Sequence, residues 1–172
     1  MKKTTLRSLK NKAWKVFSEY IRRKDADEGG TNYCFTCGQP KFWKELQAGH
    51  FIGGRTNAVL FNEEIVKPQC LMCNVFLRGN YGPYTLKMLD LHGREKVEEF
   101  MQLKHQVVKY TRSDVEDIIN RYKEKLKGLA SRGDPDLQAG AGNSRGTGGE
   151  SLPVSTTDDL THPVNQQPAK AA

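Results

Sequence analysis

The chain has 172 residues, of which 37% are apolar, and its mean hydropathy is −0.68. No apolar stretch approaches the roughly 18 residues of a membrane span, and no apolar signal segment follows the initial Met-Lys-Lys, so we expect a cytoplasmic protein without a membrane partner. The net charge is +7, and +9 falls on residues 1–130, an excess that favours a polyanion such as nucleic acid but would also suit an ordinary basic domain.

Residues 1–30 predict a basic amphipathic helix. Apolar residues recur at three- and four-residue steps from Leu6 to Ile21, and residues 25–30 end the helix. The apolar stripe is expected to pack in the core while the charges point outward, either as a solvated face or along DNA phosphates. The cations around the stripe are Lys10, Lys12, Lys15, Arg22, Arg23 and Lys24.

All four cysteines fall into two Cys-x-x-Cys pairs, Cys34/Cys37 and Cys70/Cys73. Disulfides are disfavoured in a cytoplasmic chain, and a redox motif would need only one such pair within a βαβ pattern. Two pairs are the usual tetrahedral zinc arrangement, because each knuckle offers two thiolates about 2.3 Å from the metal. We therefore expect a structural Zn²⁺ ion whose binding is coupled to folding.

The 32 residues between the two pairs must hold structure of their own. Residues 46–52 predict a short strand, a Gly-Gly turn follows, and residues 57–61 predict a returning strand. After the second pair, residues 74–78 are expected to start a helix that Gly79 ends. The predicted order is knuckle, hairpin, knuckle, helix.

His50 is the only histidine in this spacer. Because four cysteines saturate a zinc ion, His50 is available for another task, and imidazole is the natural general base near neutral pH. An Asn on the following helix can ligate a metal ion or orient a phosphate. The alternative is an ordinary strand histidine.

The last segments predict helices. Residues 83–91 form a short helix that a His-Gly pair ends, and residues 94–104 form a second one. Ser113 and Glu116 predict a capping box at the start of a third helix. Two histidines are expected at the surface, His92 and His105.

Residues 131–172 lack aromatic residues and contain six of the 16 glycines and four of the seven prolines, so they predict a disordered tail. Composition therefore divides the chain into four parts. They are a basic N-terminal helix (1–30), a zinc-knuckle core (31–92), C-terminal helices (93–130) and the tail (131–172).

Several ordered motifs lie between residues 10 and 130. They are Gln-Ala-Gly-His-Phe (47–51), Phe-Asn-Glu-Glu (61–64), Gln-Cys-Leu-Met-Cys-Asn (69–74), Gly-Asn (79–80), Pro-Tyr (83–84), Leu-His-Gly-Arg-Glu (91–95) and Arg-Tyr-Lys-Glu-Lys-Leu-Lys (121–127). Together they resemble the NinG (Rap) recombination proteins of lambdoid phages.

The resemblance implies an α+β fold, in which helices flank a small zinc-stabilised ββα-metal core of the HNH type. It also implies an endonuclease that cuts branched DNA, such as Holliday junctions and D-loops, during phage recombination in the host cytoplasm. By position, the four cysteines would hold the zinc and His50 would match the first catalytic histidine. Asn74 would lie on the motif's helix and Asn80 in the Gly-Asn pair.

The expected mechanism is metal-assisted phosphodiester hydrolysis. His50 would take a proton from the attacking water, and Mg²⁺ or Mn²⁺ would stabilise the developing charge. Asn74, Asn80 and Asn62 would hold that ion or orient His50. The expected partner is branched DNA, with a homodimer and other recombination proteins left open.

The sequence departs from the motif patterns in three places. Gly49 stands where HNH enzymes often have Asp, residues 65–67 lack the Asn and His common in the family, and Leu77 replaces a frequent Lys. Glu63 and Glu64, with Asn62, are candidate substitute oxygen ligands. Two alternatives follow: a non-catalytic zinc-containing DNA-binding protein that assists recombination, and a protein-interaction scaffold.

Overall fold

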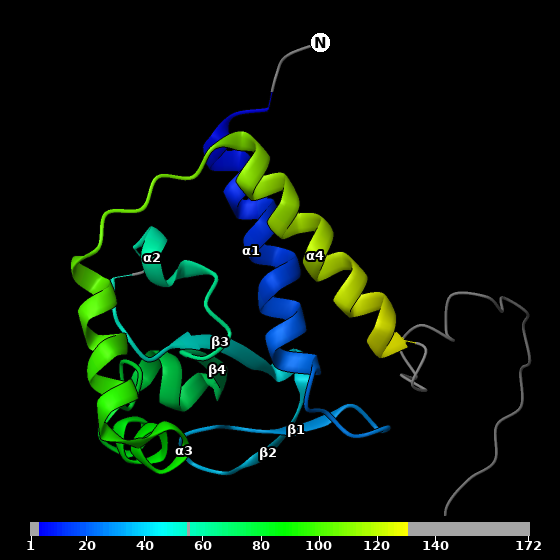
Figure 1. The fold of residues 1–172 in the computed structure, drawn as a ribbon. Coiled ribbons are helices and arrows are strands. Elements are labelled where there is room, and N and C mark those ends of the chain that lie inside the picture. Colours follow the sequence, from blue (N-terminus) through cyan, green and yellow to red (C-terminus); the bar gives the residue numbers. More distant parts are fainter. Residues whose placement is uncertain (1–3, 55, 131–172) are drawn as a thin grey trace, which may run out of the picture. The chain divides into compact units, whose positions relative to one another are not determined.

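A computed structural model describes residues 4–54 and 56–130 (Figure 1). The predicted tail, residues 131–172, lies outside the described residues. The elements are α1 (Leu6–Arg23), β1 (Thr31–Tyr33), β2 (Pro40–Phe42), η1 (Trp43–Glu45), β3 (Leu46–His50), α2 (Asn57–Leu60), β4 (Val66–Cys70), η2 (Met72–Phe76), α3 (Tyr81–Gln102), η3 (Leu103–His105) and α4 (Arg112–Ala130). The α+β fold class is confirmed. No helix in the described ranges is both long and apolar enough to cross a membrane.

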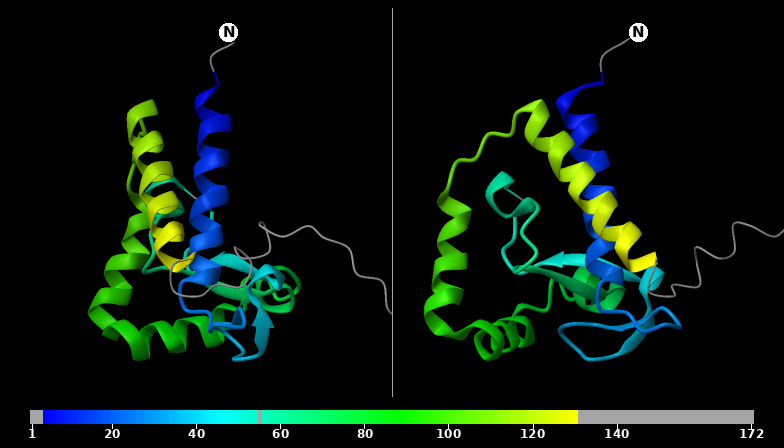
Figure 2. Two further views of the ribbon diagram at one scale, coloured as in Figure 1. Left: turned by 90° about the vertical axis from the view of Figure 1, so that its right-hand side faces the viewer. Right: turned by 45° about the vertical axis from the view of Figure 1, so that its right-hand side comes forward.

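Helices α1 and α4 lie side by side and run in the same direction (Figures 1 and 2). Near their starts, Arg112 donates a hydrogen bond to the carbonyl oxygen of Thr4. Nearer their ends, the rings of Phe17 and Tyr122 meet edge to face with centroids 4.9 Å apart. The four-residue spacing of the predicted stripe explains the packing, because it turns one face of α1 into the core: Leu9, Ala13, Phe17 and Ile21.

Two antiparallel hairpins carry the cysteines. Strands β1 and β2 pair on either side of the first cysteine pair, and β3 pairs with β4 so that Leu46 lies opposite Cys70 and His50 opposite Val66. The predicted strand over 57–61 is wrong, because that segment contains the one-turn helix α2. Its Val59 and Leu60 are both buried, whereas adjacent residues of a strand face opposite sides.

Helix α3 contains the predicted interruption at Gly93, whose φ of 76° and ψ of 165° lie outside the helical region. The first half of α3 is tied to the β3–β4 hairpin by Tyr84. The Tyr84 hydroxyl lies 3.0 Å from the carbonyl oxygen of Gly49 and 3.1 Å from that of Ile65. Burial of this side chain raises the pKa of Tyr84.

The remaining helix boundaries and histidines differ in part from expectation. The backbone N–H of Thr111 donates to the carboxylate of Asp114, and the Asp114 N–H donates to the Thr111 hydroxyl. These two residues therefore form the capping box of α4, two positions earlier than the predicted pair.

His105 is exposed as expected, but His92 is half-buried with its ring edge-on to Phe100.

Glu63 joins the segment before β4 to α4. Its Oε1 accepts a hydrogen bond from the Tyr122 hydroxyl at 2.8 Å and another from Lys125 Nζ. Partial burial alone would raise the pKa of Glu63, but the hydrogen bonds from Lys125 and Tyr122 outweigh it and lower the pKa below its ordinary value.

We expect Glu63→Gln to reduce the free energy of unfolding at pH 7 by about 1 kcal/mol, because a partly exposed charged hydrogen-bond pair is lost. The pKa of Glu63 is lower in the folded chain than in the unfolded one. Its stabilisation is therefore complete above the unfolded-state pKa, about 4.3, and disappears as pH falls through the folded-state pKa.

Urea unfolding at pH 7 and below pH 4 measures this difference. The gap between wild type and Glu63→Gln should narrow in acid, while Glu64→Gln, at an exposed neighbouring carboxylate, should match wild type at pH 7. A gap that does not change with pH would contradict the assignment.

Candidate metal centre and adjoining cavity

The four cysteine sulfurs converge although the pairs are far apart in sequence. All four Sγ atoms lie within 4.8 Å of one another. The Sγ atoms of Cys37 and Cys70 are 3.8 Å apart, which equals the roughly 3.8 Å edge of a tetrahedron whose Zn–S bonds measure about 2.3 Å. Cys34, Cys70 and Cys73 are buried and Cys37 is exposed. This cluster can hold a metal ion such as zinc.

Hydrogen-bond donors surround the sulfurs. Cys34 Sγ lies 3.3 Å from the backbone nitrogen of Cys70 and 3.3 Å from the hydroxyl of Thr36. Burial raises the pKa of Cys34, but hydrogen bonds from the Cys37 backbone, the Thr36 hydroxyl and the Cys70 backbone outweigh it and lower the pKa to about 6. Burial, with the neighbouring thiols, raises the pKa of Cys37 to about 12. Metal binding must therefore displace protons from this cluster, so its affinity falls with falling pH.

Asn80 contacts the cysteine cluster. It adopts a left-handed backbone conformation (φ 48°, ψ 52°) just before α3, and its Nδ2 donates to Cys73 Sγ at 3.3 Å. Such a hydrogen bond stabilises a thiolate and orients it toward a metal. Asn80 was expected beside His50, but it does not line the cavity described next.

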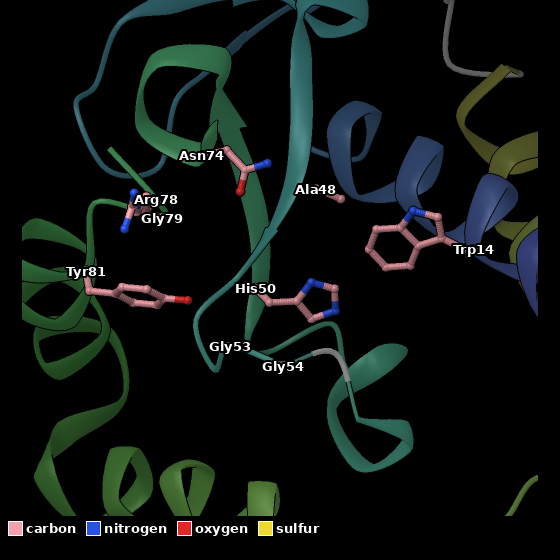
Figure 3. A pocket seen from close by; sticks show the side chains of 9 residues that line it. All are labelled: Trp14, Ala48, His50, Gly53, Gly54, Asn74, Arg78, Gly79 and Tyr81. Carbon is pink, nitrogen blue, oxygen red and sulfur yellow. The ribbon is translucent and has the colours of Figure 1, made fainter. Parts of the chain in front are cut away.

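A cavity of about 230 Å³ lies between α1, β3 and the segment that follows η2 (Figure 3). None of the described residues that line it is acidic. The lining residues are Trp14, Ala48, His50, Gly53, Gly54, Asn74, Arg78, Gly79 and Tyr81.

His50 is the last residue of β3, and its side chain is only 9% exposed. Its ring stacks on Trp14 with centroids 5.1 Å apart and an interplanar angle of 18°. His50 Nε2 lies 3.4 Å from the carbonyl oxygen of Leu60. If Nε2 carries the proton and donates to this carbonyl, Nδ1 is the basic nitrogen of the ring.

Asn74 comes from η2 and reaches the same cavity. Its Nδ2 donates to Gln47 Oε1, and Figure 3 shows its Oδ1 directed into the cavity. Asn62 lines a different cavity, with Glu63 and Tyr122, and its Oδ1 accepts from the Glu64 backbone nitrogen. The structure therefore brings His50 and Asn74 together and leaves Asn62 and Asn80 apart.

Gly49 has no room for a side chain. A Cβ there would lie 1.9 Å from Gln69 Oε1 and 3.0 Å from Asn74 Oδ1. Gln69 is fully buried, and its Nε2 donates to the carbonyl oxygen of Gly79 at 2.8 Å. An aspartate at position 49 would displace this side chain, which gives the departure from the HNH pattern a physical cause.

A second hollow, of about 430 Å³, adjoins the first and shares Trp14, Ala48 and Asn74 with it. Its other lining residues include two cations, Arg22 and Lys44. The joined cleft therefore has Arg22 and Lys44 in one part and Arg78 in the other. The sequence did not single out Lys44, Arg78 or Trp14, because only the folded chain brings these three elements together.

The two arginines at the end of α1 differ from the expectation that both point outward. Arg23 is only 7% exposed, pairs with Glu19 at 2.7 Å and lies over the Trp43 ring at 4.9 Å. Arg22 is half-buried and donates to the carbonyl oxygens of Ser18 and Leu46. Arg23 therefore serves packing, and Arg22 alone of the two reaches the cleft.

The four lysines also differ in accessibility. Lys12 and Lys15 are exposed. Lys10 is half-buried and donates to Asn57 Oδ1 at 3.2 Å, and Lys24, also half-buried, lies 3.7 Å from a carboxylate oxygen of Asp25. Lys12 and Lys15 are therefore the most accessible of the predicted phosphate contacts.

The fold and site define a small α+β protein with a four-cysteine cluster that can hold a metal ion and a separate cavity lined by His50 and Asn74. A family model described as "Bacteriophage Lambda NinG protein" matches residues 1–132. The chain belongs to this NinG family.

Three relatives, each named "Protein ninG", illustrate the similarity. The one from Escherichia phage lambda is 31% identical over 121 residues, which are 68% of this chain and 55% of the relative. The ones from Escherichia phage 933W and Salmonella phage P22 are 30% and 29% identical over 121 residues and 68% of this chain, covering 56% and 55% of the relatives. The chain thus spans about half the length of these curated relatives. No solved structure matches.

Zinc should be present at one ion per chain in freshly purified, reduced protein, because the cysteine cluster has the ligand number of a closed zinc site. Removing it by chelation should lower the melting temperature by more than about 10 °C, since metal binding contributes to folding free energy. Elemental analysis and thermal unfolding measure both.

Zn²⁺ added back should restore the melting temperature, and Mg²⁺ should not. A metal-free preparation that melts at the same temperature as the zinc-loaded protein would contradict the assignment.

Proposed function

We propose that the protein is an HNH-like, structure-specific endonuclease that hydrolyses phosphodiester bonds in branched DNA during phage recombination. One observation carries this proposal: His50 and Asn74 lie in one cavity, within a cleft that also holds Arg22, Lys44 and Arg78. A histidine base, a polar orienting group and cations for phosphates are the parts that phosphodiester hydrolysis requires.

His50 is the proposed general base. Its Nε2 lies near the Leu60 carbonyl, and its ring is held by stacking on Trp14. These contacts fix the ring plane and favour the tautomer whose Nδ1 accepts the proton of an attacking water. In this arrangement His50 activates the water without contributing to the cysteine cluster.

Asn74 is the proposed ligand or orienting group. Its amide nitrogen is engaged by Gln47, so its oxygen faces the cavity. One amide oxygen without a carboxylate fits an ion that takes its remaining ligands from water and DNA phosphates, rather than a preformed site. Mg²⁺ or Mn²⁺ bound there with DNA would stabilise charge on the scissile phosphate.

The cations of the cleft are proposed to hold the DNA strand. Arg22 and Lys44 would bind phosphates on one side of His50, and Arg78 would bind them on the other. Phosphate contacts position a strand but carry no sequence information, which suits an enzyme that selects DNA by shape. A homodimer would match the two-fold symmetry of a four-way junction.

A second candidate is a non-catalytic DNA-binding protein that assists recombination. The observation that favours it is the lack of acidic groups among the described residues lining the cavity, together with the packing that excludes a side chain at Gly49. This alternative uses the same cysteine cluster and basic surface but not His50.

Cleavage of a labelled four-way junction separates the two candidates. With Mg²⁺ or Mn²⁺, wild type should nick the junction, and His50→Ala should lower the rate by roughly 10²–10⁴, the usual contribution of a positioned base. The variant should keep its zinc content and its junction affinity. His105→Ala, at an exposed histidine, is the matched control and should cut like wild type.

Two results would contradict the nuclease proposal. If wild type binds junctions but cuts none with either ion, the non-catalytic candidate replaces it. If His50→Ala loses zinc or unfolds while the more conservative His50→Gln is folded and cuts at the wild-type rate, His50 is structural.

The exposed lysines of α1 should bind DNA of every shape. Replacing Lys12 and Lys15 by Ala should weaken binding to linear and branched DNA alike and reduce the slope of log affinity against log salt by about 2, one unit for each phosphate contact. Lys104→Ala/Lys109→Ala removes the same charge from exposed positions outside α1. The affinity for DNA and the salt slope should therefore fall further in the Lys12→Ala/Lys15→Ala variant than in the Lys104→Ala/Lys109→Ala variant. Equal affinities and slopes would make α1 a packing element only.

A further inference from the structure

We propose that an exposed apolar surface beside the cavity inserts between unstacked bases at the branch point of the DNA. This inference rests on the proposed function for its substrate class and adds how the branch is recognised. We call the surface the apolar wedge, and it consists of Leu71, Met72, Val75, Phe76 and Leu77.

The exposure of the apolar wedge is not explained by the fold. Its five side chains are between 48% and 66% exposed, with Phe76 the most exposed. They fall within seven consecutive residues, where Cys73 is the buried one. A run of large apolar side chains in water is unfavourable, and such contiguous patches usually mark an interaction surface.

The backbone under the wedge is held in place. The backbone nitrogen of Leu77 donates to the Met72 carbonyl at 2.8 Å, and that of Gly79 donates to the Cys73 carbonyl at 2.9 Å. Arg78 and Gly79 then take left-handed conformations, with φ of 48° and 99°. A surface ordered in advance loses little conformational entropy on binding.

Charge and position identify the occupant as DNA. Residues 65–89 contain no Asp or Glu, and the cation Arg78 directly follows Leu77. The segment that carries the wedge, residues 71–78, also supplies Asn74 and Arg78 to the cavity wall. An apolar surface that adjoins Arg78, with no acidic residue in the same stretch of chain, suits a partner with flat apolar faces on a polyanionic backbone, which describes unstacked bases. Phe, Leu and Met are side chains that proteins insert between base steps.

Phe76→Ala tests the wedge on a four-way junction that carries 2-aminopurine at the crossover. Wild type should increase the 2-aminopurine fluorescence by unstacking the base, and Phe76→Ala should abolish that increase. The variant should bind the junction about tenfold more weakly, the size of one lost base-stacking contact. Affinity for linear duplex and the salt slope should stay unchanged because the cations remain.

Two further variants complete the test. Phe76→Trp keeps a stacking ring and should retain the fluorescence increase, whereas Val107→Ala, at a position 87% exposed outside the wedge, should behave like wild type. An unaltered fluorescence and affinity in Phe76→Ala would overturn the proposal. The proposal would also be overturned if wild type sedimented as a dimer and Phe76→Ala as a monomer, because the surface would then join two copies of the chain.

The wedge and the nuclease proposal fail in different ways. If wild type cuts junctions and Phe76→Ala binds and cuts them equally well, only the wedge is wrong. If wild type unstacks the crossover base through Phe76 but cuts nothing, only the nuclease proposal is wrong.

Discussion

Convergence of four thiols on one point is the constraint on which the rest of the site depends. It joins the β1–β2 hairpin to the end of β4 and to η2, so the segment after Cys73 is fixed relative to β3. That segment carries Asn74 and Arg78 into the cavity where His50 lies. A metal ion that holds the four sulfurs therefore also sets the distance between the proposed base and the groups around it.

The buried side chain of Gln69 determines which residue can stand at position 49. Gln69 occupies the space that a side chain at position 49 would need and bonds to Gly79, just after the wedge segment. Gly49 is therefore a packing requirement of β3 against β4. The same contact excludes a carboxylate at that position, so under the nuclease proposal a catalytic cation would take its ligands from Asn74, water and DNA.

Features that reside in local spacing could be predicted from the sequence. The cysteine pairs, the stripe of α1 and the interruption at Gly93 needed only pattern and residue chemistry, and the α+β class followed from the family resemblance. The strand that pairs with β3 could not be predicted. Val59 and Leu60 are residues typical of a strand, and only the folded chain shows that both are buried in a one-turn helix. Asn80 and Arg23 differ from expectation because Asn80 donates a hydrogen bond to the sulfur of Cys73 and the guanidinium of Arg23 lies over the Trp43 ring, contacts that only the folded chain shows. The stacking of Trp14 on His50 could not be predicted either, because it arises only when α1 packs on β3.

The central claim is that the metal centre positions the His50 cavity. Amide hydrogen exchange, measured on zinc-loaded protein and after chelation, tests it most directly. The account predicts that removing zinc strongly accelerates exchange in residues 46–50 and 66–80, with the largest change around Cys73 and Asn74, because these backbones are held through the sulfurs. Unchanged protection of both segments in verified metal-free protein would show that the cavity forms without the metal and would contradict the account.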